Sequence, residues 1–273
     1  MAVAAAGDLP ASPALAGIAR TGPADQANGA YLEVAAASPA DVWAVGGSSG
    51  NRALIVHWNG TAWRRVPSPD PRPGDDDALS GVAAASVSDI WAVGHAGDKT
   101  LIEHWNGEAW QQVPSPSPRP RSETGDALSA VTVASARNAW AVGTKELPSG
   151  LAGTLIEHWN GRAWRRVPSP SPPLGCSDDV NYLSSVAVTS ARSAWAVGTD
   201  GVDCAQSYFE RWNGTAWKIT HRRIRHLGSG WTISALAATT ARSVWAVGST
   251  FGFEPLILHW NGSVWQRVHS PAA

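Results

Sequence analysis

The sequence predicts an all-β protein, a five-bladed β-propeller with four antiparallel strands in each blade. The tetrapeptide Trp-Ala-Val-Gly occurs five times, at steps of 48, 49, 55 and 50 residues. The five copies begin at Trp43, Trp91, Trp140, Trp195 and Trp245. His-Trp-Asn-Gly, or Arg-Trp-Asn-Gly in the fourth copy, follows each of them, and another Trp lies three residues after its glycine. Because no helical periodicity separates the copies, each repeat of about fifty residues is expected to form one blade.

Each repeat contains the segments expected of four short strands, in a fixed order. The first is small and β-branched, as in residues 128–135, and a polar turn such as residues 38–41 follows it. The second contains Trp-Ala-Val-Gly, the third contains Leu-Ile-x-His-Trp, and the fourth begins at the last Trp of the repeat. Between the third and fourth strands, Asn-Gly predicts a two-residue hairpin in which both turn residues have positive φ.

The repeats also predict the domain boundaries. We expect residues 1–30 to form an N-terminal segment, extended or partly disordered. Residues 31–273 are expected to form one propeller, because stacked repeats share a continuous core. The blades are predicted at about residues 31–70, 78–115, 127–170, 182–221 and 231–270.

The composition limits the partners. Hydrophobic residues make up 44% of the chain and charged residues 16%, which is typical of a folded protein. The formal net charge is −1, so no basic field attracts nucleic acid. The apolar runs are too short to span a bilayer. We expect a monomer that binds a small molecule or a glycan, with no cofactor, no metal and no membrane insertion.

The phrases Leu-Ile-Glu-His-Trp-Asn-Gly, Asp-Val-Trp-Ala-Val-Gly and Val-Pro-Ser-Pro resemble the repeats of actinobacterial secreted propeller proteins, most of which have no assigned function. The resemblance covers about residues 31–270. A large excess of Arg over Lys is typical of a GC-rich genome. The opening Met-Ala-Val-Ala-Ala-Ala-Gly is similar to what remains of a trimmed signal peptide. These features favour a secreted protein and leave a cytoplasmic location open.

The repeat separates scaffold residues from candidate site residues. Fifteen of the 16 Trp occur as three per blade, so we expect them to pack neighbouring blades with their indole N–H groups bound to the backbone. The His of His-Trp-Asn-Gly recurs four times, and a catalytic His is not needed four times. Both sets are predicted to be structural.

The variable loops are predicted to lie together at one end of the propeller. The turns between first and second and between third and fourth strands are short, whereas the second-to-third loops and the connections between blades vary. Variable loops on a rigid scaffold usually carry the site. Cys176 and Cys204 both fall on this variable face, near the fourth blade, and we expect a disulfide between them. In a reducing compartment they would be two free thiols.

One row of positions is predicted to surround the mouth of the central channel on this face. The row lies fourteen residues before each Trp-Ala-Val-Gly and consists of Gly29, Asp77, Asp126, Asn181 and Trp231. Trp231 is the one Trp outside the repeat, and we expect it to be an exposed platform. Glu33, on the same strand as Gly29, is the lone carboxylate in a second row of small residues.

The fourth blade has the cationic segment 221–226 where other blades have Pro-Ser-Pro, and this segment is expected to enter the same mouth. The predicted ligand-binding residues are Trp231, Asn181, Tyr182, Tyr31, His95, His226 and Arg225.

Three functions stay open. A sugar offers C–H faces to an indole and hydroxyls to carboxylates, so the first hypothesis is a ligand-binding propeller with one asymmetric site for a carbohydrate or another polar small molecule. The second is an enzyme that uses the same mouth, either a glycoside hydrolase or a lyase or cyclase that transfers protons, with Asp77, Asp126 and Glu33 as catalytic candidates. The third is a protein-interaction platform on the variable face.

Overall fold

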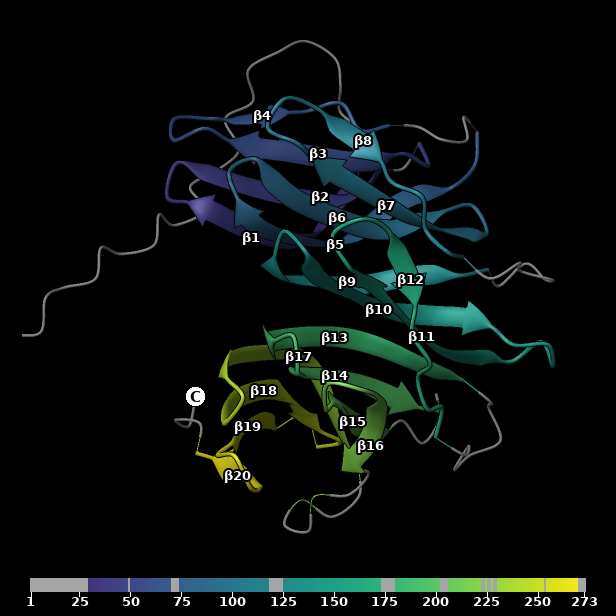
Figure 1. Ribbon diagram of the computed structural model, residues 1–273, viewed down its shortest axis with the longest axis vertical. Helices are drawn as coiled ribbons and strands as arrows, with labels where there is room; N and C mark the ends of the chain where they lie inside the picture. The colour runs from purple at the N-terminus through teal and green to yellow at the C-terminus, as the bar shows by residue number, and fades with distance from the viewer. Residues whose placement is uncertain are drawn as a thin grey trace, which may run out of the picture.

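The computed structural model describes residues 29–48, 50–69, 74–117, 125–172, 180–201, 206–221, 224, 227, 230–252 and 254–269. These residues form five four-stranded antiparallel sheets, and in each sheet the strands follow one another in chain order (Figure 1). The predicted five-bladed propeller is confirmed. Residues 1–28 lie outside the described part, so the N-terminal segment stays a prediction. Within the described part, no helix has the length and apolar character needed to cross a membrane.

The four strands of a blade run from the propeller axis to its rim. The innermost strands are β1 (Gly29–Ser38), β5 (Asp77–Ser86), β9 (Ala127–Ser135), β13 (Asn181–Ser190) and β17 (Trp231–Thr240). The second strands are β2 (Asp41–Ser48), β6 (Asp89–Ala96), β10 (Asn138–Glu146), β14 (Ser193–Asp200) and β18 (Ser243–Thr250). The third strands are β3 (Ala53–Trp58), β7 (Lys99–Trp105), β11 (Ala152–Trp159), β15 (Gln206–Trp212) and β19 (Pro255–Trp260). The outer strands are β4 (Trp63–Arg65), β8 (Trp110–Gln112), β12 (Trp164–Arg166), β16 (Trp217–His221) and β20 (Trp265–Val268).

The glycine of Trp-Ala-Val-Gly lies opposite a bulge in the innermost strand. In the second blade, Gly94 pairs with Leu79 and the register then shifts before Gly81 pairs with Val93. A Cβ atom on Gly94 would overlap the backbone carbonyl of Ala78. Only glycine therefore allows the first two strands to approach this closely at the bulge.

The Asn-Gly turns differ from the predicted two-residue hairpin. Trp58 pairs with Trp63, so four residues connect β3 to β4. Gly60 has a φ of 90°, whereas Asn59 does not have a positive φ. The Asn59 side-chain oxygen instead accepts hydrogen bonds from the backbone N–H groups of residues 61 and 62, at 3.1 and 3.0 Å. The prediction was wrong because the Asn side chain closes the turn itself.

Four hydrophobic cores lie between successive blades within the described residues. The Trp of Trp-Ala-Val-Gly is at the centre of each and packs on two Trp of the next blade. The Trp91 ring centroid is 4.9 Å from that of Trp159 and 5.2 Å from that of Trp164, the second contact being edge to face. The other three interfaces repeat these contacts. At these interfaces the predicted packing of the repeated Trp between blades is confirmed. The predicted indole–backbone hydrogen bond is present for Trp105, Trp159 and Trp212, whereas the Trp91 indole donates to a side-chain carboxylate.

The repeated His belongs to the same scaffold. His104 packs on Trp91 with ring centroids 4.2 Å apart, and its Nε2 lies 2.8 Å from Asp89 Oδ1. The same carboxylate oxygen accepts a hydrogen bond from the Trp91 indole at 3.1 Å. In the fourth blade Arg211 replaces the His, and its guanidinium lies 5.3 Å from the Trp195 ring centroid. The side chain at this repeat position, His or Arg, therefore packs over an indole. This packing explains why the position recurs without a catalytic role.

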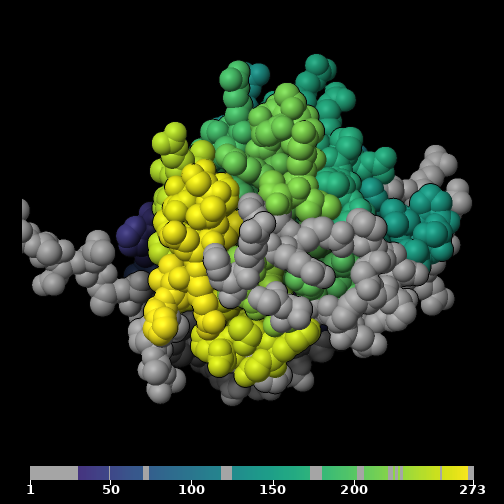
Figure 2. All heavy atoms as spheres, turned by 90° about the horizontal axis from the view of Figure 1, so that it is seen from below, coloured from purple at the N-terminus to yellow at the C-terminus, as the bar shows by residue number. Residues whose placement is uncertain are grey.

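The five blades form an arc that is open on one side. Innermost strands pack in series, β1 on β5, β5 on β9, β9 on β13 and β13 on β17. No hydrophobic core joins the fifth blade to the first among the described residues. In Figure 1 the opening lies at the left, between β1 and β18, and the view from below in Figure 2 has the fifth blade, in yellow, at the front. The two end blades therefore each expose a face that the other blades bury.

Candidate functional site

The starts of the innermost strands lie on the variable face, as predicted. The backbone N–H of Asp77 donates to the carbonyl of Asn51, in the second-to-third loop of the first blade, at 3.1 Å. The N–H of Asp126 donates to the carbonyl of Asp98, in the same loop of the second blade, at 3.0 Å. Each of these strands is therefore anchored to the preceding blade before it enters its own sheet.

Four of the five residues predicted to surround the channel mouth lie inside the blade interfaces. Asp77, Asp126, Asn181 and Trp231 are only 3, 1, 2 and 0% exposed. Asp126 accepts hydrogen bonds from the Ser117 hydroxyl at 3.0 Å and from a backbone N–H, and Asn181 donates to a backbone carbonyl at 3.2 Å. Burial also raises the pKa of Asp126. These side chains connect blades and do not form an open mouth.

The prediction of an exposed platform at Trp231 is wrong. Its indole is fully buried and stacks on Phe209, with ring centroids 6.2 Å apart, in the core between the fourth and fifth blades. Phe209 takes the position of an Ile in the other blades, and Leu258 takes the position of a Glu. The large apolar side chain at position 231 fills this apolar interface, and its removal from water stabilises the folded protein.

The other predicted residues that the structure describes lie on three different blades and do not form one site. Glu33 is exposed, and its carboxylate accepts a hydrogen bond from the adjacent backbone N–H at 3.3 Å. Tyr31 is 44% exposed on the same strand, on the open side of the first blade. Tyr182 is half-buried, and half-buried His95 has its Nε2 4.0 Å from a carboxylate oxygen of Asp76. The predicted residues that lie outside the described part are Cys176, Cys204, Arg225 and His226.

A row of buried carboxyl groups, which the sequence reasoning missed, runs through three interfaces. Glu103, Glu157 and Glu210 are each 0% exposed, in the third strands of their blades. Each accepts a hydrogen bond from the serine in the Val-Pro-Ser-Pro segment of the preceding blade. The donors are Ser68, Ser115 and Ser169, at 2.8, 3.0 and 3.1 Å respectively.

Burial raises the pKa of these three carboxyl groups. It reaches about 8 for Glu103, about 7 for Glu157 and about 8 for Glu210, although the serine hydrogen bond opposes the shift. Nearby Asp77 and Asp126 raise the pKa of Glu103 and Glu157 further. The sequence did contain a signal, because every Pro-Ser-Pro segment before the fourth blade precedes a blade with this Glu, and the blade after segment 221–226 has a Leu.

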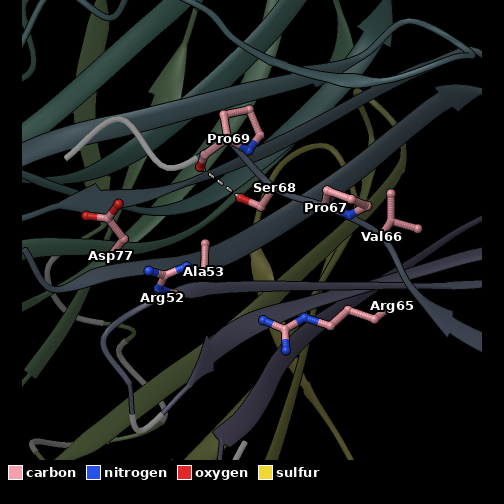
Figure 3. A pocket seen from close by; sticks show the side chains of 8 residues that line it. All are labelled: Arg52, Ala53, Arg65, Val66, Pro67, Ser68, Pro69 and Asp77. Atoms are coloured by element: carbon pink, nitrogen blue, oxygen red, sulfur yellow. Dashed lines mark hydrogen bonds between the residues drawn. The ribbon is translucent and has the colours of Figure 1, made fainter. Parts of the chain in front are cut away.

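The interface between the first two blades contains a cavity of about 380 Å³. It is lined by Arg52, Ala53, Arg65, Val66, Pro67, Ser68, Pro69 and Asp77 (Figure 3). Ala53 occupies the position that Thr100, Thr154 and Ser207 occupy in the next three blades. Thr100 Oγ1 lies 2.6 Å from Ser115 Oγ, and Ser169 donates to Thr154 Oγ1 at 2.8 Å. Where those interfaces hold a hydroxyl, the first blade has a methyl group and a cavity.

The cavity wall contains hydrogen-bond donors, hydrogen-bond acceptors and apolar side chains. In Figure 3 the Ala53 methyl lies between Asp77, Arg52 and Ser68, and Arg65 lies on the neighbouring strand. Both Arg side chains are exposed, whereas Asp77 is buried. Guanidinium groups donate hydrogen bonds in a planar fork, and a carboxylate accepts them from hydroxyls. The described residues include no group of three or more His, Cys, Asp and Glu placed to hold a metal ion.

No protein-family model and no curated protein matches the chain, so the actinobacterial resemblance stays a prediction. Solved propellers do match. The fucose-specific lectin from Aleuria aurantia is 12% identical over 88% of this chain and 76% of its own, with a TM-score of 0.55. The SapL1 lectin in complex with alpha methyl fucoside is 13% identical over 89% and 81%, with a TM-score of 0.54. The GH74 xyloglucanase from Xanthomonas campestris is 14% identical over 88% and 38%, with a TM-score of 0.54. At these identities the likeness shows the fold alone.

Proposed function

We propose that this chain is a ligand-binding propeller whose site is the cavity between the first and second blades, and that its ligand is a small carbohydrate. One observation carries the proposal. Three successive blades place a hydroxyl at one interface position, whereas the first blade has Ala53 there, in the wall of a cavity of about 380 Å³. A departure from the repeat in the wall of a cavity points to a role other than packing between blades.

The chemistry of the lining suits a sugar. Asp77 and the Ser68 hydroxyl can accept hydrogen bonds from sugar hydroxyls, and Arg52 and Arg65 can donate to sugar oxygens. Val66, Pro67 and Pro69 give apolar surface for the C–H faces of a ring. The cavity lies within the size range of small-ligand pockets. Two solved propellers of similar fold are lectins, and secretion, which the sequence predicts, would bring the protein into contact with glycans.

The test compares the wild type with variants that give the cavity the residues of the neighbouring blade. A glycan array identifies the best ligand, and titration calorimetry then measures its Kd. Ala53→Thr restores the hydroxyl found at residue 100, and Arg65→Gln introduces the residue found at Gln112. Gln112→Arg, at the same position in the second blade, is the matched control.

We expect Ala53→Thr to abolish binding with an unchanged or higher melting temperature, because Thr at this position fits two other interfaces of the same fold. Arg65→Gln should weaken binding by about tenfold, which is about 1.4 kcal/mol. Gln112→Arg should bind as the wild type does. Binding that is equally tight in Ala53→Thr would show that the cavity is not the site, and a wild type that binds no glycan would overturn the proposed ligand class.

The catalytic alternative has less support. Of the three carboxylates suggested for it, Asp77 lines the cavity, Asp126 accepts hydrogen bonds from the second and third blades, and Glu33 is exposed on the first blade. A glycoside hydrolase of the usual kind needs two carboxyl groups on either side of one glycosidic bond. Among the described residues these three do not meet around one cavity.

A further inference from the structure

The two end blades expose a cluster of large apolar side chains. Among the described residues, eight large hydrophobic side chains are exposed. Six of them lie in β1, in β18 or directly after β18: Tyr31, Leu32, Val34, Trp245, Val247 and Phe251. Such a concentration on two facing ends of one arc is more than the scattered apolar exposure of an ordinary surface.

The face of the fifth blade lacks the partner that every other blade has. Trp245 is 37% exposed, whereas the equivalent Trp43, Trp91, Trp140 and Trp195 are 1, 2, 1 and 0% exposed. Val247 is 44% exposed, whereas the equivalent Val of each other blade is fully buried. Trp245 stacks on its own His259, with centroids 4.2 Å apart. Among the described residues, Trp245 makes no ring contact of the kind that Trp91 makes with Trp159 and Trp164 of the following blade.

The face of the first blade is the other half of the same interface. Trp63 is half-buried, whereas the equivalent Trp110, Trp164, Trp217 and Trp265 are 5, 4, 4 and 3% exposed because each packs edge to face on the preceding blade. Trp63 keeps its contact with Trp58, at 6.0 Å between centroids. A preceding blade would have to supply the Trp that covers this pair.

The two faces do not match each other in their polar residues. At three interfaces a Pro-Ser-Pro segment is followed by a blade with a buried Glu, and the fourth blade, which lacks the segment, is followed by Leu258. The fifth blade ends in a serine-containing Val-His-Ser-Pro segment, but the first blade has Val56 at the Glu position. Direct closure of the ring would combine a serine-containing segment with a valine, which no described interface does.

We propose that the open side is a docking surface for one further blade of the same repeat type, supplied by a partner polypeptide. Towards the fifth blade it would present the paired Trp of His-Trp-Asn-Gly-x-x-Trp and a buried Glu. Towards the first blade it would present the Trp of Trp-Ala-Val-Gly. The new interfaces would continue the four that the structure already contains, with the same contacts.

The experiment tethers such a blade to the full chain. A copy of residues 125–166, the third blade without the Val-Pro-Ser-Pro segment that would meet Val56, is joined after Ala273 through a flexible Gly/Ser linker, which gives the blade a high effective concentration at the open side. Hydroxyl-radical footprinting with mass spectrometry measures the oxidation rate of Trp245 and of Trp140. The control carries the same tethered blade with both of its Trp equivalent to Trp159 and Trp164 changed to Ser.

In the untethered chain Trp245 should be oxidised much faster than Trp140, in line with their exposures of 37 and 1%. The tethered blade should lower the oxidation rate of Trp245 to that of Trp140, and the control blade should leave the oxidation rate of Trp245 unchanged. The proposal is overturned if the tethered blade does not lower the oxidation rate of Trp245. It is also overturned if Trp245 is already protected in the untethered chain, either in a monomer, which would mean ring closure, or in a dimer, which would mean that a second copy covers this face. Light scattering separates these two cases.

Discussion

Replacing Glu103 with Gln should make the protein more stable at alkaline pH. Burial moves the pKa of this carboxyl from 4.5 to about 8, so the folded state holds a proton that the unfolded chain releases. The free energy of unfolding is unaffected below the unfolded pKa, falls as the pH rises from about 4.5 to about 8, and stays low above that. At about 1.4 kcal/mol per pKa unit, the full loss from this one group is at most about 5 kcal/mol.

Gln keeps the shape and the acceptor that Ser68 binds but has no charge to bury. We therefore expect Glu103→Gln to equal the wild type within about 1 kcal/mol at pH 5 and to exceed it by about 2–5 kcal/mol at pH 8. Urea unfolding at five pH values from 5 to 9, followed by Trp fluorescence and by circular dichroism, measures the difference. Glu108→Gln, at an exposed turn in the same blade, is the control and should follow the wild type at every pH.

The reasoning is refuted if the wild type is equally stable at pH 5 and pH 8 and Glu103→Gln follows the same curve. That result would mean that the carboxyl ionises in the folded state near its ordinary pKa, and that water reaches the interface between the first two blades.

Three further changes test the scaffold, all by urea unfolding. Trp140→Ala should lower the free energy of unfolding by about 3–5 kcal/mol, and Trp245→Ala by only about 1–2 kcal/mol because its indole is already partly in water. Equal losses would show that the fifth blade is covered in solution. Asp89→Ala removes the acceptor that one indole and one imidazole share, and should lower the free energy of unfolding by about 1–3 kcal/mol. Asp89→Asn should restore part of this stability, and an unchanged urea midpoint in Asp89→Ala would contradict the shared hydrogen bonds. Asn106→Ala should cost about 1 kcal/mol, and no loss would mean that Gly107 alone closes the turn.

The fold could be predicted because its unit is local. Each strand carries its own motif, and the repeat spacing of Trp-Ala-Val-Gly gave the number of blades and the order of strands. The same repetition identified the Trp and His that pack between blades, because residues needed at every interface recur in every repeat.

The site could not be predicted in the same way, because it depends on residues from two blades at once. Its own repeat predicts an exposed Trp231, but Phe209 in the preceding blade and Leu258 in its own third strand decide that it is buried. Ala53 lies in a strand whose pattern otherwise predicts scaffold. Alignment with Thr100 and Thr154 shows the missing hydroxyl, and only the folded interface shows the cavity beside it.

The most direct test of the proposed function is a crystal structure of the protein soaked with the glycan that binds it most tightly. We predict electron density for a sugar ring between Ala53, Asp77 and Arg65, with ring hydroxyls on the carboxylate and the C–H face against the prolines. A sugar bound elsewhere, with the cavity between the first two blades filled only by water, would contradict the account.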